Sequence, residues 1–290
     1  MPDRGGIAGG PGLAVALSIS GFFCVSAMDA IIKDLSGTFG AMQLVLFRSF
    51  FGLIPILPMV IMSGGLGILS TRRPILQAVR SILATVTTFL FFLSLRYMPL
   101  GEATALVFAA PICLTVLAGP FLGEKVGPRR WVAVVIGFIG VLVILRPGSD
   151  VFSPYALLPV SAALTFSVTM LLGRKLALTD NSTSIVFYTS LGGVLASGAL
   201  VPMDWTTPEM AHLPWLLLLG VLGGVGQMLI VQAFRYAEAS MLAPFEYTTI
   251  IWAITFGYLI WSELPDTWTF AGVAIVIASG VYIARREARG

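Results

Sequence analysis

Residues 235–263, RYAEASMLAPFEYTTIIWAITFGYLIWSE, repeat a pattern that first occurs at residues 96–124, RYMPLGEATALVFAAPICLTVLAGPFLGE. Each copy consists of a turn, an apolar segment of membrane length and a closing carboxylate. Subtracting 139 from the later numbers superimposes three residues on earlier ones without a gap: Arg235 on Arg96, Tyr236 on Tyr97 and Glu263 on Glu124. The chain is therefore internally duplicated. In a membrane protein such duplication indicates a transporter whose binding site lies between the halves near the bilayer midplane.

The composition of the chain is that of an integral membrane protein. Hydrophobic residues make up 57% of its 290 residues and charged residues only 11%, far from the roughly 45–50% and 25% of a soluble domain. The net charge of +3 comes from loop Lys and Arg, which in membrane proteins report orientation. The sequence has no basic stripe with interleaved aromatic residues, so nucleic acid is not an expected partner.

Metal and cofactor chemistry are not expected from this sequence. His212 is the only histidine, which argues against a His-based metal site. Cys24 and Cys113 both lie inside apolar segments, where a thiol behaves as a small hydrophobe. No glycine-rich phosphate loop is present, so the chain is not expected to hydrolyse ATP. The first apolar stretch, residues 13–33, is interpreted as a spanning helix rather than a signal peptide, because the repeat requires it.

Ten segments are apolar and long enough to cross ~30 Å of hydrocarbon at about 1.5 Å per residue. They cover residues 13–33, 41–62, 74–97, 100–122, 131–146, 155–176, 183–203, 214–236, 240–262 and 268–285. Five lie on each side of residues 147–154, which predicts a first repeat at 1–146, a linker and a second repeat at 155–290. Because five is odd, the second copy enters from the other face. The expected fold is all-α, with ten transmembrane helices in two inverted repeats around a central cavity.

Counting Lys and Arg in alternate loops predicts that both termini are cytoplasmic. With the N-terminus inside, twelve of these residues lie on the cytoplasmic side. The opposite side holds three: Lys33, Arg96 and Arg146. The linker at residues 147–154 is then periplasmic.

Short motifs close helices at matching places in the two halves. Lys33 closes the first segment, Gly173-Arg174-Lys175 the sixth, Gly123-Glu124 the fourth and Ser262-Glu263 the ninth. In their order and spacing these motifs resemble the EamA family of the drug/metabolite transporter superfamily, and the resemblance covers nearly the whole chain. With the run Phe245-Glu246-Tyr247, the chain is most similar to bacterial inner-membrane exporters of aromatic amino acids.

The resemblance implies a multi-pass protein of the bacterial inner membrane that exports a small molecule through a central cavity by alternating access. The chain departs from the common pattern at its prolines. Pro111 and Pro244 are the expected helix kinks, but they do not coincide when 139 is subtracted. Kink positions are therefore not expected to transfer from one half to the other.

A polar face on the third segment predicts one wall of the cavity. Its members are spaced by four, four and three residues, as on one face of an α-helix: Gln77, Ser81, Thr85 and Thr88. In the second half the last three correspond to Gly220, Gly224 and Gln227. A polar stripe in a lipid-length helix should face protein or water. The alternative is that these small and hydroxylated residues serve close helix packing.

Aromatic residues near the predicted cavity are candidates for receiving an apolar side chain. Tyr247 and Trp252 lie on the ninth segment, and Phe108 occupies the position that matches Tyr247 in the first half. Aromatic and aliphatic surface could bind a side chain while amides and hydroxyls hold the amino-acid backbone. Most of the 19 Phe, 7 Tyr and 6 Trp residues are nevertheless expected to face lipid or to pack.

Four ionisable residues fall inside the predicted spans: Asp29, Arg48, Arg80 and Glu246. Each should have a partner or water, since an unpaired charge there costs about 2.5 to 3.5 kcal/mol on insertion scales. Matching depths predict two gating pairs, Asp29 with Arg48 near the periplasmic face and Arg80 with Glu246 near the cytoplasmic face. Alternatively, Arg80 extends to the headgroups and Asp29 lies in a hydrated vestibule. Glu246 is matched by Val107, so the shared scaffold does not require its carboxylate.

The sequence therefore predicts a secondary transporter, not an enzyme, that exports aromatic or other neutral amino acids. Exchange of nucleotide sugars or drugs is the alternative, but a phosphate site would need several converging cations, and Arg48 and Arg80 are expected near opposite faces. An intramembrane enzyme would need a nucleophile with a base, or a metal set. The expected partners are the small-molecule substrate and the lipid bilayer. The oligomeric state stays open, a monomer being one alternative.

Overall fold

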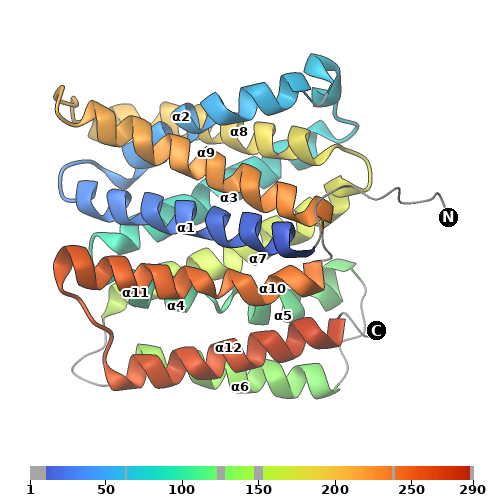
Figure 1. The fold of residues 1–290 in the computed structure, drawn as a ribbon, viewed down its shortest axis with the longest axis vertical. Coiled ribbons are helices and arrows are strands. Elements are labelled where there is room, and N and C mark those ends of the chain that lie inside the picture. Colours follow the sequence, from blue (N-terminus) through green and yellow to red (C-terminus); the bar gives the residue numbers. More distant parts are fainter. Residues whose placement is uncertain (1–10, 63, 123–127, 147–152, 237–238, 288–290) are drawn as a thin grey trace.

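The computed structural model describes residues 11–62, 64–122, 128–146, 153–236 and 239–287, and their regular structure is helical throughout (Figure 1). Most of the predicted linker (147–152) and both predicted cytoplasmic termini (1–10 and 288–290) lie outside these residues. The α-helices are α1 (Pro11–Leu35), α2 (Ala41–Met62), α3 (Pro74–Leu95), α4 (Leu100–Val107), α5 (Ala110–Leu122), α6 (Pro128–Leu145), α7 (Leu157–Ala177), α8 (Ser182–Leu200), α9 (Leu213–Tyr236), α10 (Ala239–Glu246), α11 (Thr248–Trp261) and α12 (Thr267–Glu287). The 3-10 helices are η1 (Gly65–Leu69), η2 (Pro154–Ala156) and η3 (Val201–Asp204).

Seven stretches of the described chain are long and apolar enough to cross a membrane, judged by length and composition. They are Gly12–Leu35, Ala41–Met62, Pro74–Leu95, Leu100–Leu117, Pro154–Ala177, Ser182–Leu200 and Leu213–Ala233. Shorter apolar helices cover Trp131–Leu145, Thr248–Trp261 and Thr267–Tyr282. Each apolar segment predicted from the sequence falls on one of these stretches, and three of them are short of a full span. The all-helical prediction is confirmed for the described residues.

Helix boundaries follow the turn chemistry of the sequence. Pro74 and Pro128 begin α3 and α6, where a missing backbone N–H is tolerated because the first turn offers it no acceptor. The Asn181 side chain caps α8 by accepting a hydrogen bond of 2.9 Å from the backbone N–H of Thr183. Ser262 ends α11 in the left-handed backbone region, with a φ of 56°.

Two of the predicted segments are broken helices, and the breaks coincide in the two halves. Glu246 ends α10 and Val107 ends α4, and these positions differ by the same 139 residues that relate the repeats. This corrects the expectation that kinks would differ because Pro111 and Pro244 are out of register. Pro111 lies in the first turn of α5, after the break, where proline is tolerated. Pro244 lies within α10, before the break, and its side chain is outside the described residues.

The backbone groups released at the breaks find local partners. In the first half, the N–H groups of Phe108 and Ala109 donate to carbonyls three residues earlier, at 3.2 and 3.1 Å. In the second half, the carbonyls of Phe245 and Glu246 accept hydrogen bonds from the hydroxyls of Thr248 and Thr249, at 2.6 and 2.7 Å. Irregular backbone at membrane depth is thereby satisfied, as it must be away from water.

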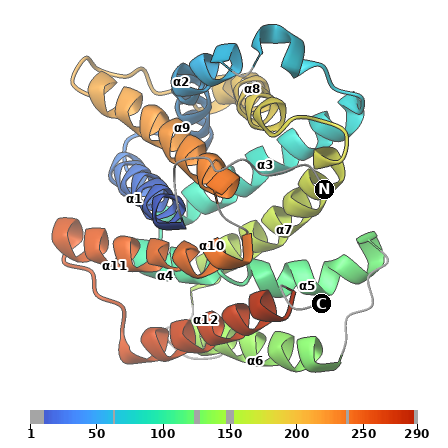
Figure 2. The same cartoon turned by 45° about the vertical axis from the view of Figure 1, so that its right-hand side comes forward.

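Helices pack mostly across the two halves of the chain (Figure 2). α1 packs on α9 and α3 on α7; α2 packs on α9 and α3 on α8; α2 also meets α8, and α6 meets α12. Each helix of the first half has a counterpart in the second, in chain order from α1 and α7 to α6 and α12. Exchanging each helix for its counterpart reproduces this same set of six pairs. The α2–α9 contact depends on Gly220, because a Cβ there would lie 2.3 Å from Phe51 Cβ and 3.0 Å from the Phe47 carbonyl oxygen.

Two ion pairs connect helix ends at one end of the bundle. Lys33, in the last turn of α1, pairs with Glu263, which follows α11. Arg146, directly after α6, pairs with Asp266, directly before α12, with 2.5 Å between Nη2 and Oδ2. α6 therefore ends where its counterpart α12 begins.

Polar contacts of another kind connect loops at the opposite end of the bundle. Asp180, between α7 and α8, accepts hydrogen bonds from the hydroxyl of Thr71 and from the backbone N–H of Arg72 at 3.3 Å. The hydroxyl of Tyr188 donates to the Leu69 carbonyl at 3.0 Å. The loop before α3 is thus attached to the turn between α7 and α8.

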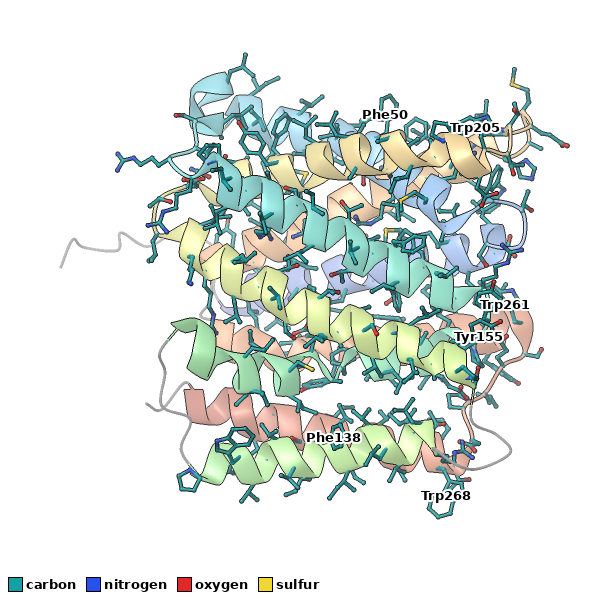
Figure 3. The ribbon with its side chains drawn as sticks, turned by 180° about the vertical axis from the view of Figure 1, so that it is seen from behind. Phe50, Phe138, Tyr155, Trp205, Trp261 and Trp268 are labelled. Atoms are coloured by element: carbon teal, nitrogen blue, oxygen red, sulfur yellow. The ribbon has the colours of Figure 1, made fainter. Side chains whose placement is uncertain are left out.

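Large apolar side chains cover the outside of the bundle, as lipid contact requires. Phe50 and Phe138 are 55% and 56% exposed near the middle of the helices (Figure 3). Tyr155, Trp205 and Trp268 lie with Trp261 toward one end of the bundle (Figure 3). Such aromatic residues are typical of the belt at a membrane interface.

Candidate functional site

One cavity of about 160 Å³ lies between helices of both halves. Two of its helices, α2 and α3, come from the first half, and three, α7, α8 and α9, from the second. Its lining consists of Arg48, Gly52, Ile56, Arg80, Ala84, Thr87, Thr88, Phe166, Thr169, Met170, Val186, Thr189, Ser190, Gly223, Gly224 and Gln227. The cavity is smaller than the roughly 300 to 1,000 Å³ of a typical ligand pocket. In this conformation it has room for a small group rather than for a large metabolite.

Arg48 and Arg80 both reach this cavity. Their depths near opposite faces stay a prediction, but both reach one cavity, because a long side chain can carry its guanidinium well away from the depth of its own Cα. Arg80 Nη1 donates a hydrogen bond to the hydroxyl of Thr189. The Nε atoms of both arginines are buried and have no hydrogen-bond partner within the described part of the chain. No described carboxylate lies within 4.0 Å of either guanidinium.

Two glycines make room for the arginines. A Cβ on Gly173 of α7 would lie 3.2 Å from Arg80 Nε, and a Cβ on Gly223 of α9 would lie 3.7 Å from Arg48 Cγ and Nε. Asp29 of α1 is buried, with 5% of its surface exposed, and interacts electrostatically with Arg48. The charge of Arg48 thus has an acidic neighbour, while a gating role for the pair stays a prediction.

Hydroxyl groups supply most of the other polar atoms of the cavity. Thr88 donates to the Ala84 carbonyl and Thr169 to the Thr165 carbonyl, each at 2.9 Å. Because each hydroxyl proton is used within its own helix, its oxygen is left as an acceptor toward the cavity. The site therefore combines cationic donors, the amide of Gln227 and hydroxyl acceptors, which together suit a zwitterionic or anionic polar group.

The sequence-predicted stripe on α3 divides between two surfaces. Thr88 lines the cavity, as does Gln227 on α9. Gln77, Ser81 and Thr85 face α8 and the turn before it instead: the Gln77 amide donates to Asp180 at 3.2 Å, and the Ser81 hydroxyl to the Tyr188 carbonyl at 2.9 Å. Thr85 is buried and donates to the Ser81 carbonyl at 2.9 Å.

The cavity-facing stripe of α3 is displaced by about one residue from the predicted one. It runs through Arg80, Ala84 and Thr87 or Thr88, again at helical spacing. One residue corresponds to about 100° around a helix. The polar residues on the neighbouring face lie against α8 and the turn before it, where Gln77 and Ser81 also line a second, more open pocket of about 510 Å³. Gly220 likewise packs, on Phe51, whereas Gly224 both packs on Pro55 and lines the cavity.

The predicted aromatic residues lie outside the lining of this cavity. Phe108 and Tyr247 stack at the two helix breaks, with ring centroids 5.0 Å apart and an interplanar angle of 28°. Trp252 packs edge-on against Phe23 at 5.1 Å. The stack joins the two symmetry-matched breaks, so it connects the halves of the chain directly.

Glu246 is exposed at the break between α10 and α11 and is not among the residues that line the cavity. The hydrogen bond of Arg80 in the described chain is to Thr189 and not to Glu246. The pairing of Arg80 with Glu246 stays a prediction for another conformation.

Sequence reasoning treated Lys33 and Glu263 as motif residues that close helices, and missed their contact. Lys33 Nζ pairs with Glu263, donates to the Met98 carbonyl at 3.3 Å and lies 4.9 Å from the centre of the Trp261 ring. The sequence did contain a sign of this contact. Lys33 and Glu263 carry opposite charges and close two helices that end at the same predicted membrane face, where they can meet. Thr87, Thr169, Thr189 and Ser190 were also missed, because isolated hydroxyls in apolar helices give no distinctive pattern.

The sequence profile of the EamA-like transporter family matches residues 12–146 and 153–285. An S-adenosylmethionine uptake transporter of Rickettsia conorii is 30% identical over 262 residues, which cover 90% of this chain and 89% of that protein. The pseudopaline exporter CntI of Pseudomonas aeruginosa (strain UCBPP-PA14) is 28% identical over 278 residues, 94% of this chain and 96% of that protein. A riboflavin transporter of Vibrio cholerae is 33% identical over 213 residues, 72% and 71% of the two chains. One solved structure, described only as that of a protein, superposes with a TM-score of 0.66 at 17% identity over 95% of this chain and 97% of that chain, which shows a shared fold alone.

Proposed function

We propose that this chain, which belongs to the EamA-like transporter family, moves a small amino-acid-type metabolite across the bacterial inner membrane by alternating access. The family and the relatives establish a membrane transporter of small molecules. The substrate class, the mechanism and the direction, for which we expect export, are the proposal. The observation that carries it is the cavity between α2, α3, α7, α8 and α9, helices of both halves, with cationic, amide and hydroxyl groups on its wall.

The mechanism follows from treating the chain as two inverted repeats of five spans, with α4 and α5 as one broken span and α10 and α11 as another. Three features support this: the helix breaks coincide under the 139-residue shift, the six helix pairs named above are unchanged when counterparts are exchanged, and α6 ends where α12 begins. In such transporters one repeat moves against the other around a fixed site near the midplane.

The proposed substrate class follows from the chemistry of the cavity and from the relatives. An amino-acid group presents a carboxylate to guanidinium donors and an ammonium to hydroxyl acceptors. S-adenosylmethionine, the named substrate of one group of relatives, is by its name an amino-acid derivative. A phosphorylated metabolite such as a nucleotide sugar is the second candidate, because Arg48 and Arg80 reach one cavity after all.

Counterflow into proteoliposomes distinguishes these candidates. We expect accumulation of a labelled amino acid, and not of labelled nucleotide sugars or cationic drugs, in vesicles preloaded with the same unlabelled compound. Ala84→Trp, which fills the cavity, should abolish counterflow, whereas Val86→Trp on the exposed side of α3 should not. Accumulation of only nucleotide sugars or drugs would reject the amino-acid proposal. Equal activity of both tryptophan variants would reject this cavity as the path.

The proposed orientation has its own test. Thr38 and Ser70 are exposed at opposite ends of the bundle, and each can carry a single cysteine in a background without Cys24 and Cys113. An impermeant thiol reagent added to intact cells should label position 38 and not position 70. The reverse pattern would place both termini outside and reject the predicted orientation.

A further inference from the structure

Arg80 carries a positive charge that the described chain does not balance. Its Nη1 donates to Thr189, a neutral hydroxyl, and its Nε is buried without a hydrogen-bond partner. No carboxylate of the described residues lies within 4.0 Å of its guanidinium. Arg48 differs, because Asp29 interacts electrostatically with it. Of the two cations at the cavity, Arg80 is therefore the one that lacks an acidic neighbour.

An unpaired guanidinium of this kind destabilises the fold unless another group accepts its hydrogen bonds and balances its charge. An ionisable side chain at membrane depth is expected to pair or to face water, and a buried donor without an acceptor loses the free energy of a hydrogen bond. The guanidinium is a rigid planar fork of donors that matches the two oxygens of a carboxylate or phosphate. Gly173 of α7 lies close to the Nε edge of this fork and places no side chain against it.

We infer that Arg80 is the anchor for an anionic group of the substrate, a carboxylate or a phosphate, and that Arg48, with Asp29 beside it, is not. The inference rests on the proposed function and narrows its substrate class to molecules with an acidic group. Thr189 contacts the anchor, the hydroxyls of Thr87 and Thr88 line the same cavity, and all three can accept hydrogen bonds from an ammonium or hydroxyl on the same substrate. The binding geometry then depends on one fixed cation rather than on net charge in the cavity.

The test is ligand-induced thermal stabilisation of the purified protein in detergent, which does not depend on transport. The probes are phenylalanine, its carboxyl amide, and a nucleotide sugar. The wild type should bind phenylalanine at least about tenfold more tightly than the amide, and Arg80→Gln should reduce that ratio to about one. Arg80→Lys, which keeps the charge but not the fork, should give an intermediate ratio. Arg96→Gln, at an exposed position beyond the end of the same helix, should leave the ratio unchanged.

A second variant tests the same contact in case Arg80→Gln does not fold. Gly173→Ala keeps every charge but places a Cβ 3.2 Å from Arg80 Nε, and it should weaken phenylalanine binding several-fold more than amide binding. An unchanged acid-to-amide ratio in folded Arg80→Gln or Arg80→Lys protein would overturn the inference. Transport of phenylalanine without any preference over its amide would overturn it while leaving the proposed function intact. Arg80-dependent binding of the nucleotide sugar alone would keep the anchor and reject the amino-acid substrate.

Discussion

Lys33→Ala should open the end of the bundle at which α1, α3 and α11 finish. Lys33 Nζ contacts three groups there: the Glu263 carboxylate, the Met98 carbonyl oxygen and the face of Trp261. Met98 follows α3, whereas Trp261 and Glu263 lie at the end of α11, so that this side chain of α1 holds three helix ends together. We expect its removal to favour the conformation in which this end is open.

The magnitude follows from how deeply the contact is buried. A hydrogen bond to a charged group contributes about 1.5 to 3 kcal/mol, and a cation over an aromatic ring about 0.5 to 1 kcal/mol more. The side chain of Lys33 is only 9% exposed but that of Glu263 is 32% exposed, so the pair is partly screened and its contribution moves toward the ~0 to 1 kcal/mol of a surface pair. We therefore expect a net change of about 2 kcal/mol, or roughly 30-fold in the equilibrium between closed and open states.

A buried reporter cysteine measures this change. Thr104 lies on α4 and is 4% exposed, and Thr104→Cys should be labelled slowly by a bulky impermeant reagent in a background without Cys24 and Cys113. Adding Lys33→Ala should accelerate labelling at least about tenfold, because the reagent reacts only with the open state.

Matched variants separate this contact from general loosening. Glu263→Gln should have a similar effect, and combining it with Lys33→Ala should add little, as expected for residues that act through one shared contact. Arg96→Ala, also at the end of α3, removes an exposed cation and should leave labelling unchanged. Equal labelling rates in the wild type, Lys33→Ala and Glu263→Gln would refute the assignment of a closing role to this pair.

Three further outcomes are expected. Gly220→Ala should lower the stability of the fold by about 1 to 3 kcal/mol through overpacking, measured as a lower thermal transition temperature. Gly198→Ala should leave that temperature unchanged, because its Cβ would lie 3.9 Å from the nearest atom. Glu246→Gln should keep normal folding but reduce transport at least about tenfold, equivalent to about 1.4 kcal/mol. If this variant transports at the wild-type rate between pH 5.5 and 8, Glu246 has only a packing role. Burial raises the pKa of Asp180, but hydrogen bonds from neighbouring hydroxyl, amide and backbone N–H groups together lower it further, below its usual value. The stability that Asp180 contributes should therefore be present above about pH 4 and be lost as pH falls below it, and an equal acid loss in Asp180→Asn would contradict this.

Most of the fold was predictable because lipid leaves a chain few options. A spanning segment must satisfy its own backbone, so apolar runs of membrane length predict helices directly. The internal repeat indicates the positions of the helix breaks better than the prolines do. The breaks after Val107 and Glu246 follow the 139-residue shift, although Pro111 and Pro244 do not. In this chain the position of a break is a property of the repeated segment, and proline is tolerated on either side of it.

The site was predictable only in part, because polarity on a helix does not say which neighbour the helix faces. Thr88 and Gln227 line the cavity between the halves, but Gln77 bonds to the turn before α8, Ser81 to α8 itself, and Thr85 within α3. A rotation of about one residue separates a cavity face from a packing face, and both faces of α3 carry polar groups. Sequence spacing alone cannot choose between them.

By itself, the sequence determined that the chain is a duplicated helical membrane protein, where its apolar segments lie, and which few ionisable residues lie inside them. These properties depend on local hydropathy and on the repeat, so they can be read along the chain. Only the tertiary structure decided that Arg48 and Arg80 reach one cavity and that Lys33 meets Glu263. Each of these meetings depends on how helices distant in sequence cross, and on how far long side chains extend from their own depth.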